Sequence, residues 1–381
     1  MKNNRRDFIK RTSSLAAALS VGGLGAAKAS PVNDINNNAT SALEKIDWPI
    51  ADNPKTPKIC VGVSRDADEK EMLQYKQIGV DYVLMGGPPI PWTEKDLRTI
   101  MDRFKAKGLT VINMMIGGHP NTIYGREGRD AEIKKIQDSL VAAGAAGLPV
   151  VEYNFYADRL MEGYYEKKAR GGSSHTAFDY APVKDLPAKP EIGVHHAADL
   201  WNNLSYFLKA VIPVAEKAGV RMALHPNDPP IPVSHGSDQI MATFADWKKL
   251  ISVVDSPSNG MTFDCGVSRE MGEDPLEVCR YLGKKDRINH VHFRNVIVAK
   301  PYVKYAEVWL DEGQVNMFAV MKELILIGYS HGLYPEHPRA IDYDKEHAGG
   351  IQNQYPGGGG YAAQTYNVAF AQAMKLSVLS M

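Results

Sequence analysis

The feature that most constrains the fold is an alternation, repeated eight times, of a short apolar run and a longer segment with helical periodicity. The apolar runs occupy residues 58–63, 81–87, 109–118, 149–155, 220–226, 260–266, 288–296 and 331–338. Because a helical segment separates each run from the next, the pattern predicts a parallel sheet, and eight units favour a closed (β/α)8 TIM barrel of the α/β class. The alternative is an open, doubly wound sheet, although no GxGxxG motif follows any predicted strand.

The helical segments complete the eight units and define the extent of the domain. Helices are expected near 68–78, from Thr93, and at 130–146, 196–218, 243–254, 275–283, 315–328 and 362–378. Two long segments, 156–195 and 339–361, follow strand ends and are interpreted as irregular substrate loops or lids. We predict a single barrel domain over residues 56–381.

The first 55 residues differ from the rest in composition. Residues 1–29 combine paired arginines (Arg5 and Arg6), a short apolar run and a small-x-small end at Ala27–Ala29. This pattern resembles a twin-arginine signal peptide cleaved after Ala29, and predicts a periplasmic protein with the twin-arginine export machinery as a partner. The alternative is a basic, disordered tail. Residues 30–55 are interpreted as a linker.

Composition excludes several functional classes. The 381 residues carry 44 basic and 44 acidic side chains, so net charge offers no basis for binding nucleic acid. No apolar stretch reaches the ~18 residues that a membrane span requires. A homo-oligomer is left open.

Side chains able to bind metal end four consecutive predicted strands. They are His225, then Asp264 with Cys265, then His290 with His292, and finally Glu336 with His337. A single histidine or cysteine at a strand end is normally a packed or hydrogen-bonded residue, but the carboxyl ends of barrel strands share one rim. Four such ends together predict a divalent metal site, for which we select His225, Cys265, His292 and Glu336. This mixed set suits Mn²⁺, Fe²⁺, Co²⁺ or Zn²⁺ better than Ca²⁺.

Several segments resemble the mannonate dehydratase family, a branch of the xylose-isomerase-like barrels. They occur in order between about residues 60 and 375: EYNF (152–155), HPNDPP (225–230), DCG (264–266), HFRN (292–295), EGQVNMFAVMKEL (312–324), PEHPR (335–339) and GGY, which ends at Tyr361. The chain departs from the family at Glu336, where the family has aspartate, and at Pro338, where it has glycine.

The resemblance implies an activity and a set of functional residues. It implies a divalent metal, usually Mn²⁺ with Mg²⁺ also open, held by the four residues selected above, and the loss of water from an aldonic acid such as D-mannonate to give a 2-keto-3-deoxy acid. His337 and Tyr361 match positions assigned to proton transfer. Substrate contacts are expected from Asp228, Arg294, Asn295, Arg339, Tyr153 and His175. For Arg294 and Arg339, an ion pair with a neighbouring acid is the alternative.

Two other functions remain open at this point. Related barrels isomerise or epimerise free sugars with a metal held by carboxylates and histidines, and the cysteine counts against this alternative. A periplasmic sugar-acid binding protein without catalysis is the second alternative, but such proteins usually have two open lobes, which eight units in series do not suggest.

Overall fold

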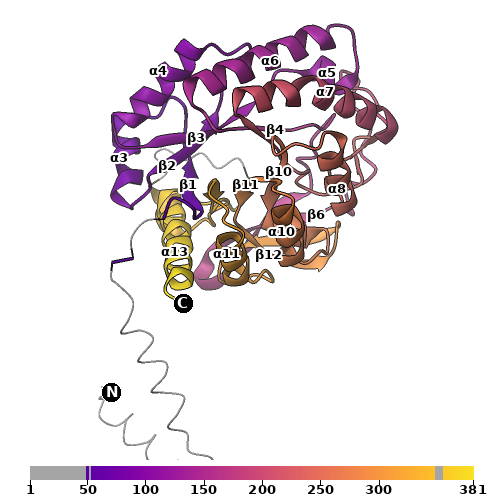
Figure 1. The fold of residues 1–381 in the computed structure, drawn as a ribbon. Helices are drawn as coiled ribbons and strands as arrows, with labels where there is room; N and C mark the ends of the chain where they lie inside the picture. The colour runs from indigo at the N-terminus through magenta and orange to yellow at the C-terminus, as the bar shows by residue number, and fades with distance from the viewer. Residues whose placement is uncertain (1–48, 51–52, 348–354) are drawn as a thin grey trace, which may run out of the picture. The chain divides into compact units, whose positions relative to one another are not determined.

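The computed structural model describes residues 49–50, 53–347 and 355–381 (Figure 1). The chain divides into two units, 1–50 and 51–381, and the second unit contains the fold. The predicted signal peptide (1–29) and most of the predicted linker (30–55) lie outside the described residues, so both remain predictions. Within the described part of the chain, no helix has the length and apolarity needed to cross a membrane.

Eight parallel strands close into a barrel in the order β1-β14-β11-β10-β7-β4-β3-β2. Pairing of Lys58 with Gly332 and of Ile59 with Leu333 joins the first strand to the last. The strands are β1 (Lys58–Gly62), β2 (Tyr82–Gly86), β3 (Thr110–Ile116), β4 (Val150–Tyr153), β7 (Arg221–Leu224), β10 (Asn259–Asp264), β11 (Ile288–His292) and β14 (Gly332–Tyr334). Seven lie within the runs predicted from the sequence, β10 begins one residue before its run, and the TIM barrel is confirmed.

Eight longer helices lie outside the strands, one after each (Figure 1). They are α3 (Glu69–Gln77), α4 (Glu94–Lys105), α6 (Arg129–Ala146), α7 (Ala197–Ala218), α8 (Phe244–Val253), α10 (Pro275–Lys284), α11 (Met317–Leu326) and α13 (Tyr361–Leu379). Thr93 caps α4 as predicted, because its hydroxyl accepts a hydrogen bond from the Asp96 amide. The shorter helices are α5 (Pro120–Tyr124), α9 (Cys265–Glu270), α12 (Asp342–Glu346) and the 3-10 turn η1 (Arg170–Gly172).

A four-stranded antiparallel sheet, which the sequence did not predict, is inserted into the barrel connections. It consists of β5 (Tyr164–Lys168), β6 (Ser174–Asp179), β12 (Asn295–Lys300) and β13 (Lys304–Val308), in the order β12-β13-β6-β5, and a small ribbon pairs β8 (Val233–Ser234) with β9 (Ser237–Asp238). The prediction that 156–195 is irregular was therefore wrong. The run 288–296, predicted as one strand, ends at His292, because the chain leaves the barrel at Phe293 and Arg294 to begin β12.

The barrel interior contains a polar layer below the carboxyl ends of the strands. Glu152 on β4 accepts hydrogen bonds from the Thr262 hydroxyl at 2.6 Å and from the Asn113 amide at 2.8 Å, and all three side chains are buried. Strand residues alternate in direction, so Tyr153 faces outward, where its ring lies 5.6 Å from that of Phe207 on α7. The inward-facing polar side chains therefore lie just below the rim at which the strands end.

Candidate active site

A cavity of about 180 Å³ opens at the carboxyl ends of β4, β7, β11 and β14. Five residues predicted from the sequence line it: His225, Asp228, His292, Glu336 and His337. Met115, Asn154, Tyr156, Arg159, Pro226 and Tyr355 complete the wall. Active sites of TIM barrels form at this end of the strands, so the cavity is the candidate active site.

Four potential metal ligands meet around the Nδ1 atom of His292. This atom lies 3.2 Å from His225 Nε2, 3.0 Å from Glu336 Oε2 and 3.9 Å from Asp264 Oδ2. Ligand bonds of about 2.1 Å to one ion place neighbouring ligand atoms roughly 3.0–3.4 Å apart in octahedral or tetrahedral arrangements. The contacts of His292 with His225 and Glu336 fit this spacing, whereas Asp264 Oδ2, at 3.9 Å, lies farther away than a neighbouring ligand. His225, Asp264 and His292 form one group of closely spaced potential ligands, and Glu336 adjoins it through its contact with His292.

The two imidazoles differ in protonation. His225 Nδ1 lies 2.6 Å from the Pro226 carbonyl oxygen, so Nδ1 carries the donated proton and Nε2 is left free to bind a metal. Burial, followed by the effect of His292, lowers the pKa of His225 to about 4, which keeps its ring neutral. His292 faces a carboxylate at each ring nitrogen, with Glu152 Oε1 3.5 Å from Nε2 and Glu336 Oε2 3.0 Å from Nδ1. Although burial opposes protonation, Glu336 and then Glu152 raise the pKa of His292 to about 9, so a cation bound at Nδ1 would have to displace a proton there.

Asp264 is the side chain at the end of β10 that approaches His292, with Oδ2 3.9 Å from His292 Nδ1. Asp264 Oδ1 caps α9 by accepting from the Val267 amide at 2.8 Å, while Oδ2 accepts from Arg294 Nε at 3.0 Å. Cys265 is the first residue of α9 and is buried, and burial raises the pKa of its thiol. Among the described residues, none of the three groups of closely spaced potential ligands includes a cysteine. Cys265 as a metal ligand therefore remains a prediction, and Asp264 is the alternative at this strand end.

Strand alternation explains why Asp264 approaches His292. Thr262 points into the barrel, where it hydrogen-bonds Glu152. Asp264, two residues later, points the same way, and Cys265 is the first residue of the helix that follows. The alternation of side chains along β10 could be predicted from the sequence, but the residue at which β10 ends and α9 begins could not.

Carboxylates outnumber cationic side chains around the cavity. The buried acids are Glu152, Asp228, Asp264, Glu270, Glu307 and Glu336, and the nearby guanidinium groups are those of Arg159, Arg294 and Arg339. Buried carboxylates are costly unless they are paired. Burial raises the pKa of Glu270 well above its usual range, and nearby acids raise the pKa of His292 and of His337, so protons offset part of this charge where no cation is bound.

Arg294 is already fully engaged by acids. Its guanidinium contacts Asp264 at 3.0 Å, Asp228 at 3.2 Å and Glu270 at 2.7 Å. Gly266 makes this position possible, because a Cβ atom at residue 266 would lie 2.7 Å from the Arg294 guanidinium. The ion-pair alternative for Arg294 is therefore the one observed, and the same holds for Arg339, which binds Glu307 at 3.0 Å.

His337 forms a dyad with a carboxylate that the sequence analysis missed. Its Nδ1 atom lies 2.8 Å from Glu307 Oε2, and its Nε2 atom lies 3.5 Å from Glu336 Oε2. Burial opposes protonation, but Glu307 and Glu336 together raise the pKa of His337. Glu307 comes from β13 of the inserted sheet, so only the recognition of that sheet could have revealed it.

Asp228 also lies at the cavity as predicted. Its carboxylate accepts a hydrogen bond from the Tyr164 hydroxyl at 3.0 Å and pairs with Arg294. Although burial opposes ionisation, Arg294 and then Arg159 lower the pKa of Asp228 to about 2. This carboxylate therefore remains charged at neutral pH.

The other predicted site residues do not line the cavity. Tyr361, at the start of α13, donates its hydroxyl to the Gln74 carbonyl at 2.8 Å, outside the barrel. Two other tyrosines line the cavity, Tyr156 and Tyr355, and Tyr355 lies six residues before Tyr361. Tyr153 faces α7. His175 hydrogen-bonds Glu312 at 3.1 Å, and Asn295 donates to the Leu310 and Val315 carbonyls at 2.8 and 3.1 Å, both within the inserted sheet and its connections. We therefore remove Tyr361, Tyr153, His175 and Asn295 from the set of direct candidates.

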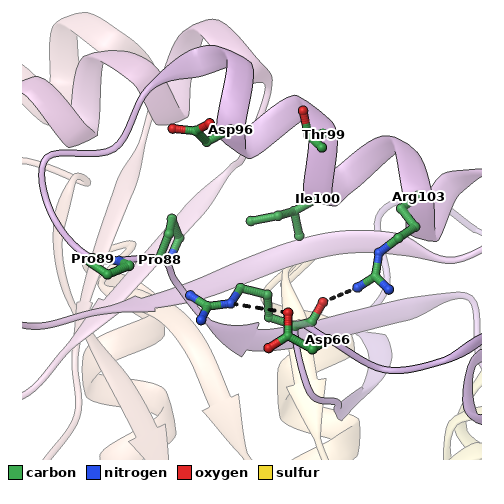
Figure 2. A pocket seen from close by; sticks show the side chains of 8 residues that line it. Asp66, Pro88, Pro89, Asp96, Thr99, Ile100 and Arg103 are labelled. Atoms are coloured by element: carbon green, nitrogen blue, oxygen red, sulfur yellow. Dashed lines mark hydrogen bonds and ion pairs between the residues drawn. The ribbon is translucent and has the colours of Figure 1, made fainter.

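A larger cavity of about 430 Å³ lies on the outer side of the β1 and β2 connections, against α4 (Figure 2). Its two arginines are occupied with the protein itself. Arg103 donates to the Ala67 carbonyl at 2.8 Å and to the Arg65 carbonyl, and Arg65 donates to the Gly87 carbonyl at 3.2 Å. No histidine or cysteine lines it, so size alone does not make it the active site.

Comparison with known proteins shows the family of the chain. Residues 193–357 match the family model described as D-mannonate dehydratase (UxuA). The mannonate dehydratase of Streptococcus suis (strain 05ZYH33) is 32% identical over 298 residues, and that of Streptococcus equi subsp. zooepidemicus (strain MGCS10565) is 31% identical over 296 residues. Each alignment covers 71% of this chain and 79% of the relative. The crystal structure of mannonate dehydratase from Streptococcus suis serotype2 superposes with a TM-score of 0.74 at 27% identity, over 84% of this chain and 94% of that one. The chain belongs to the mannonate dehydratase family.

Proposed function

We propose that the protein is a metal-dependent hydro-lyase that removes water from D-mannonate or a closely related aldonic acid to give a 2-keto-3-deoxy acid. The observation that carries the proposal is the meeting of His225, Asp264, His292 and Glu336 at the barrel rim of a chain from this family. Two imidazoles and two carboxylates suit Mn²⁺ above all, with Fe²⁺, Co²⁺, Mg²⁺ and Zn²⁺ as alternatives.

The cation would supply Lewis-acid chemistry, by binding the substrate carboxylate and a neighbouring hydroxyl and so making the C2 proton more acidic. The protein supplies the ligand geometry and a buried polar surround. Arg294 holds Asp264 and Glu336 in place from the side opposite the cavity, at 3.0 and 3.2 Å. These contacts keep both carboxylates directed at one point before the substrate arrives.

His337 is the proposed proton-transfer residue. Glu307 fixes its Nδ1 proton at 2.8 Å, which leaves Nε2 to accept the proton from C2. The imidazolium that results is stabilised by Glu307 and Glu336, and it can return the proton to the departing C3 hydroxyl as water. Tyr355 lies against His337, with 5.3 Å between the ring centroids, and is placed to contact the same hydroxyl. The original pairing of His337 with Tyr361 is thus replaced by His337 with Tyr355.

The test is to incubate the Mn²⁺-loaded protein with a panel of aldonic acids and to assay for 2-keto-3-deoxy acids. D-mannonate is expected to react fastest. His337→Asn should abolish both dehydration and the exchange of the C2 proton with D₂O. If exchange persists in that variant while dehydration is lost, another residue is the base, and His337 is only the acid.

A sugar isomerase or epimerase is the second candidate, and one observation favours it. The groups of closely spaced potential ligands among the described residues contain histidines and carboxylates and no cysteine, which is the donor set of the isomerising barrels. Assay of free ketoses and aldoses with the same protein separates the two functions, because an isomerase changes a free sugar and leaves aldonic acids intact. A binding protein would bind the acids without forming a product.

We also propose that the protein works in the periplasm after export by the twin-arginine machinery. Support comes only from the pattern of residues 1–29. Fusion of these residues to a reporter, followed by cell fractionation, tests the proposal. Arg5→Lys together with Arg6→Lys should retain the reporter in the cytoplasm.

A further inference from the structure

A second cavity, of about 270 Å³, adjoins the candidate active site over the ends of β3 and β4. We call it the distal cavity. Its wall consists of Met115, Ile116, Gly117, Gly118, His119, Pro120, Ile123, Asn154 and Tyr156. None of the proposed cation ligands belongs to it, so it has no part in the chemistry proposed above.

The distal cavity adjoins the candidate active site. Met115, Asn154 and Tyr156 line both cavities, so these three side chains form the boundary between them. The active-site cavity alone, at about 180 Å³, is smaller than the roughly 300–1,000 Å³ typical of ligand pockets. A ligand that is larger than the active-site cavity would reach the distal cavity past these side chains.

Two polar side chains in the distal cavity have unused hydrogen-bonding capacity. His119 is only 3% exposed, and neither of its ring nitrogens makes a hydrogen bond of good geometry with a described residue. Its ring stacks on Phe207, with centroids 5.6 Å apart, and burial lowers its pKa, so it is a neutral donor and acceptor. The Asn154 amide makes only a 3.8 Å contact with the Met115 sulfur. The remaining wall is mostly apolar.

This combination matches the surface of a sugar ring, which has apolar C–H faces and a rim of hydroxyls. An apolar wall with an aromatic residue suits the faces, while an imidazole and an amide suit the hydroxyls. We propose that the distal cavity is a subsite for a second sugar unit, and that the substrate class includes aldonic acids that carry a glycosyl substituent. This inference rests on the proposed function and names a larger member of the same substrate class.

The reaction on such a substrate is the same elimination. The C2 proton and the C3 hydroxyl leave as one water molecule, and C2 becomes the keto carbon after tautomerisation. The glycosidic bond at C4 is neither formed nor broken, and no oxidant or reductant is required. The product is a glycosylated 2-keto-3-deoxy acid.

Gly117 offers a direct test. A Cβ atom at residue 117 would meet no atom within 4 Å, and its φ angle is not positive, so a larger side chain there would occupy the open space. The probes are D-mannonate and 4-O-β-D-mannosyl-D-mannonate, assayed with the Mn²⁺-loaded full chain. We expect kcat/KM to be about ten-fold higher for the disaccharide acid, equivalent to ~1.4 kcal/mol. Gly117→Leu should reduce this ratio to about one or less, and Gly117→Ala, the control, should largely preserve it. Thermal unfolding confirms that both variants are folded.

The outcomes separate this inference from the proposed function. If D-mannonate reacts and the disaccharide acid does not, the subsite is refuted and the dehydratase stands. A ratio that Gly117→Leu leaves unchanged also refutes the subsite. If neither acid reacts, the proposed function fails, and calorimetric binding then decides: the subsite survives only if the disaccharide acid binds about ten-fold tighter than D-mannonate and Gly117→Leu removes the difference.

Discussion

Replacement of Glu152 by glutamine tests whether the barrel interior orients a metal ligand. Glu152 Oε1 lies 3.5 Å from His292 Nε2, on the opposite side of the ring from the cation group. The Thr262 hydroxyl and the Asn113 amide hold this carboxylate at 2.6 and 2.8 Å. Although burial opposes ionisation, His292 and the other nearby histidines lower the pKa of Glu152, so it is charged at neutral pH. Glutamine keeps the shape but removes the charge that favours a proton on Nε2.

Loss of a carboxylate that supports a ligating histidine typically weakens metal binding by about 10–100-fold, or ~1.4–2.7 kcal/mol. We expect Glu152→Gln to fall in this range when Mn²⁺ is titrated into the metal-free protein by isothermal calorimetry. Glu270→Gln is the matched control, because it removes another buried carboxylate, 2.7 Å from Arg294, that does not contact His292. A Glu152→Gln affinity within two-fold of wild type, an equal loss in both variants, or a stoichiometry of two ions per chain would refute the reasoning.

Three further predictions follow from the site and from one histidine outside it. Asp264→Ala should abolish stoichiometric Mn²⁺ binding in the same titration, whereas Cys265→Ala should leave one ion bound; the opposite result would restore the thiolate as ligand. Tyr355→Phe should lower kcat by roughly ten-fold or more if its hydroxyl contacts the leaving group, and Tyr361→Phe should change kcat less than about two-fold, as measured by 2-keto-3-deoxy acid formation. Burial, followed by Arg221 and Lys58, lowers the pKa of His331 to about 4 in the folded protein. As pH falls, His331 is therefore protonated in the unfolded chain before it is protonated in the folded one. Its contribution to stability should be complete above about pH 6.5 and lost progressively toward pH 4; His331→Gln should flatten the fall in Tm over that range, and an unchanged pH profile would contradict the assignment.

Much of the site was predictable from local pattern alone. His225, His292 and Glu336 each end a strand, and a closed parallel barrel brings such ends to one rim whatever the details of its loops. Asp228 and His337 follow directly after two of those ends, so they too were placed near the cavity. For these residues, strand order and direction were sufficient.

Other parts depended on contacts between distant segments. The pairing of Glu307 with His337 requires β13, whose strand partners β6 and β12 lie in separate insertions. The sequence analysis predicted that Arg294 contacts substrate. In the structure its guanidinium instead pairs with acids from four other segments of the chain. Such pairings depend on how the insertions fold back on the barrel, and the periodicity of hydrophobic residues along the chain does not predict this.

The sequence by itself determined the eightfold alternation, and with it the barrel and the rim on which the ligands meet, because hydrophobic period and strand direction are local properties. Only the tertiary structure brought Asp264 close to His292 and placed Tyr355, not Tyr361, in the wall of the cavity. At both places the chain leaves one element for another, so the direction of a side chain depends on the residue at which the turn occurs. That residue is set by packing against the rest of the protein.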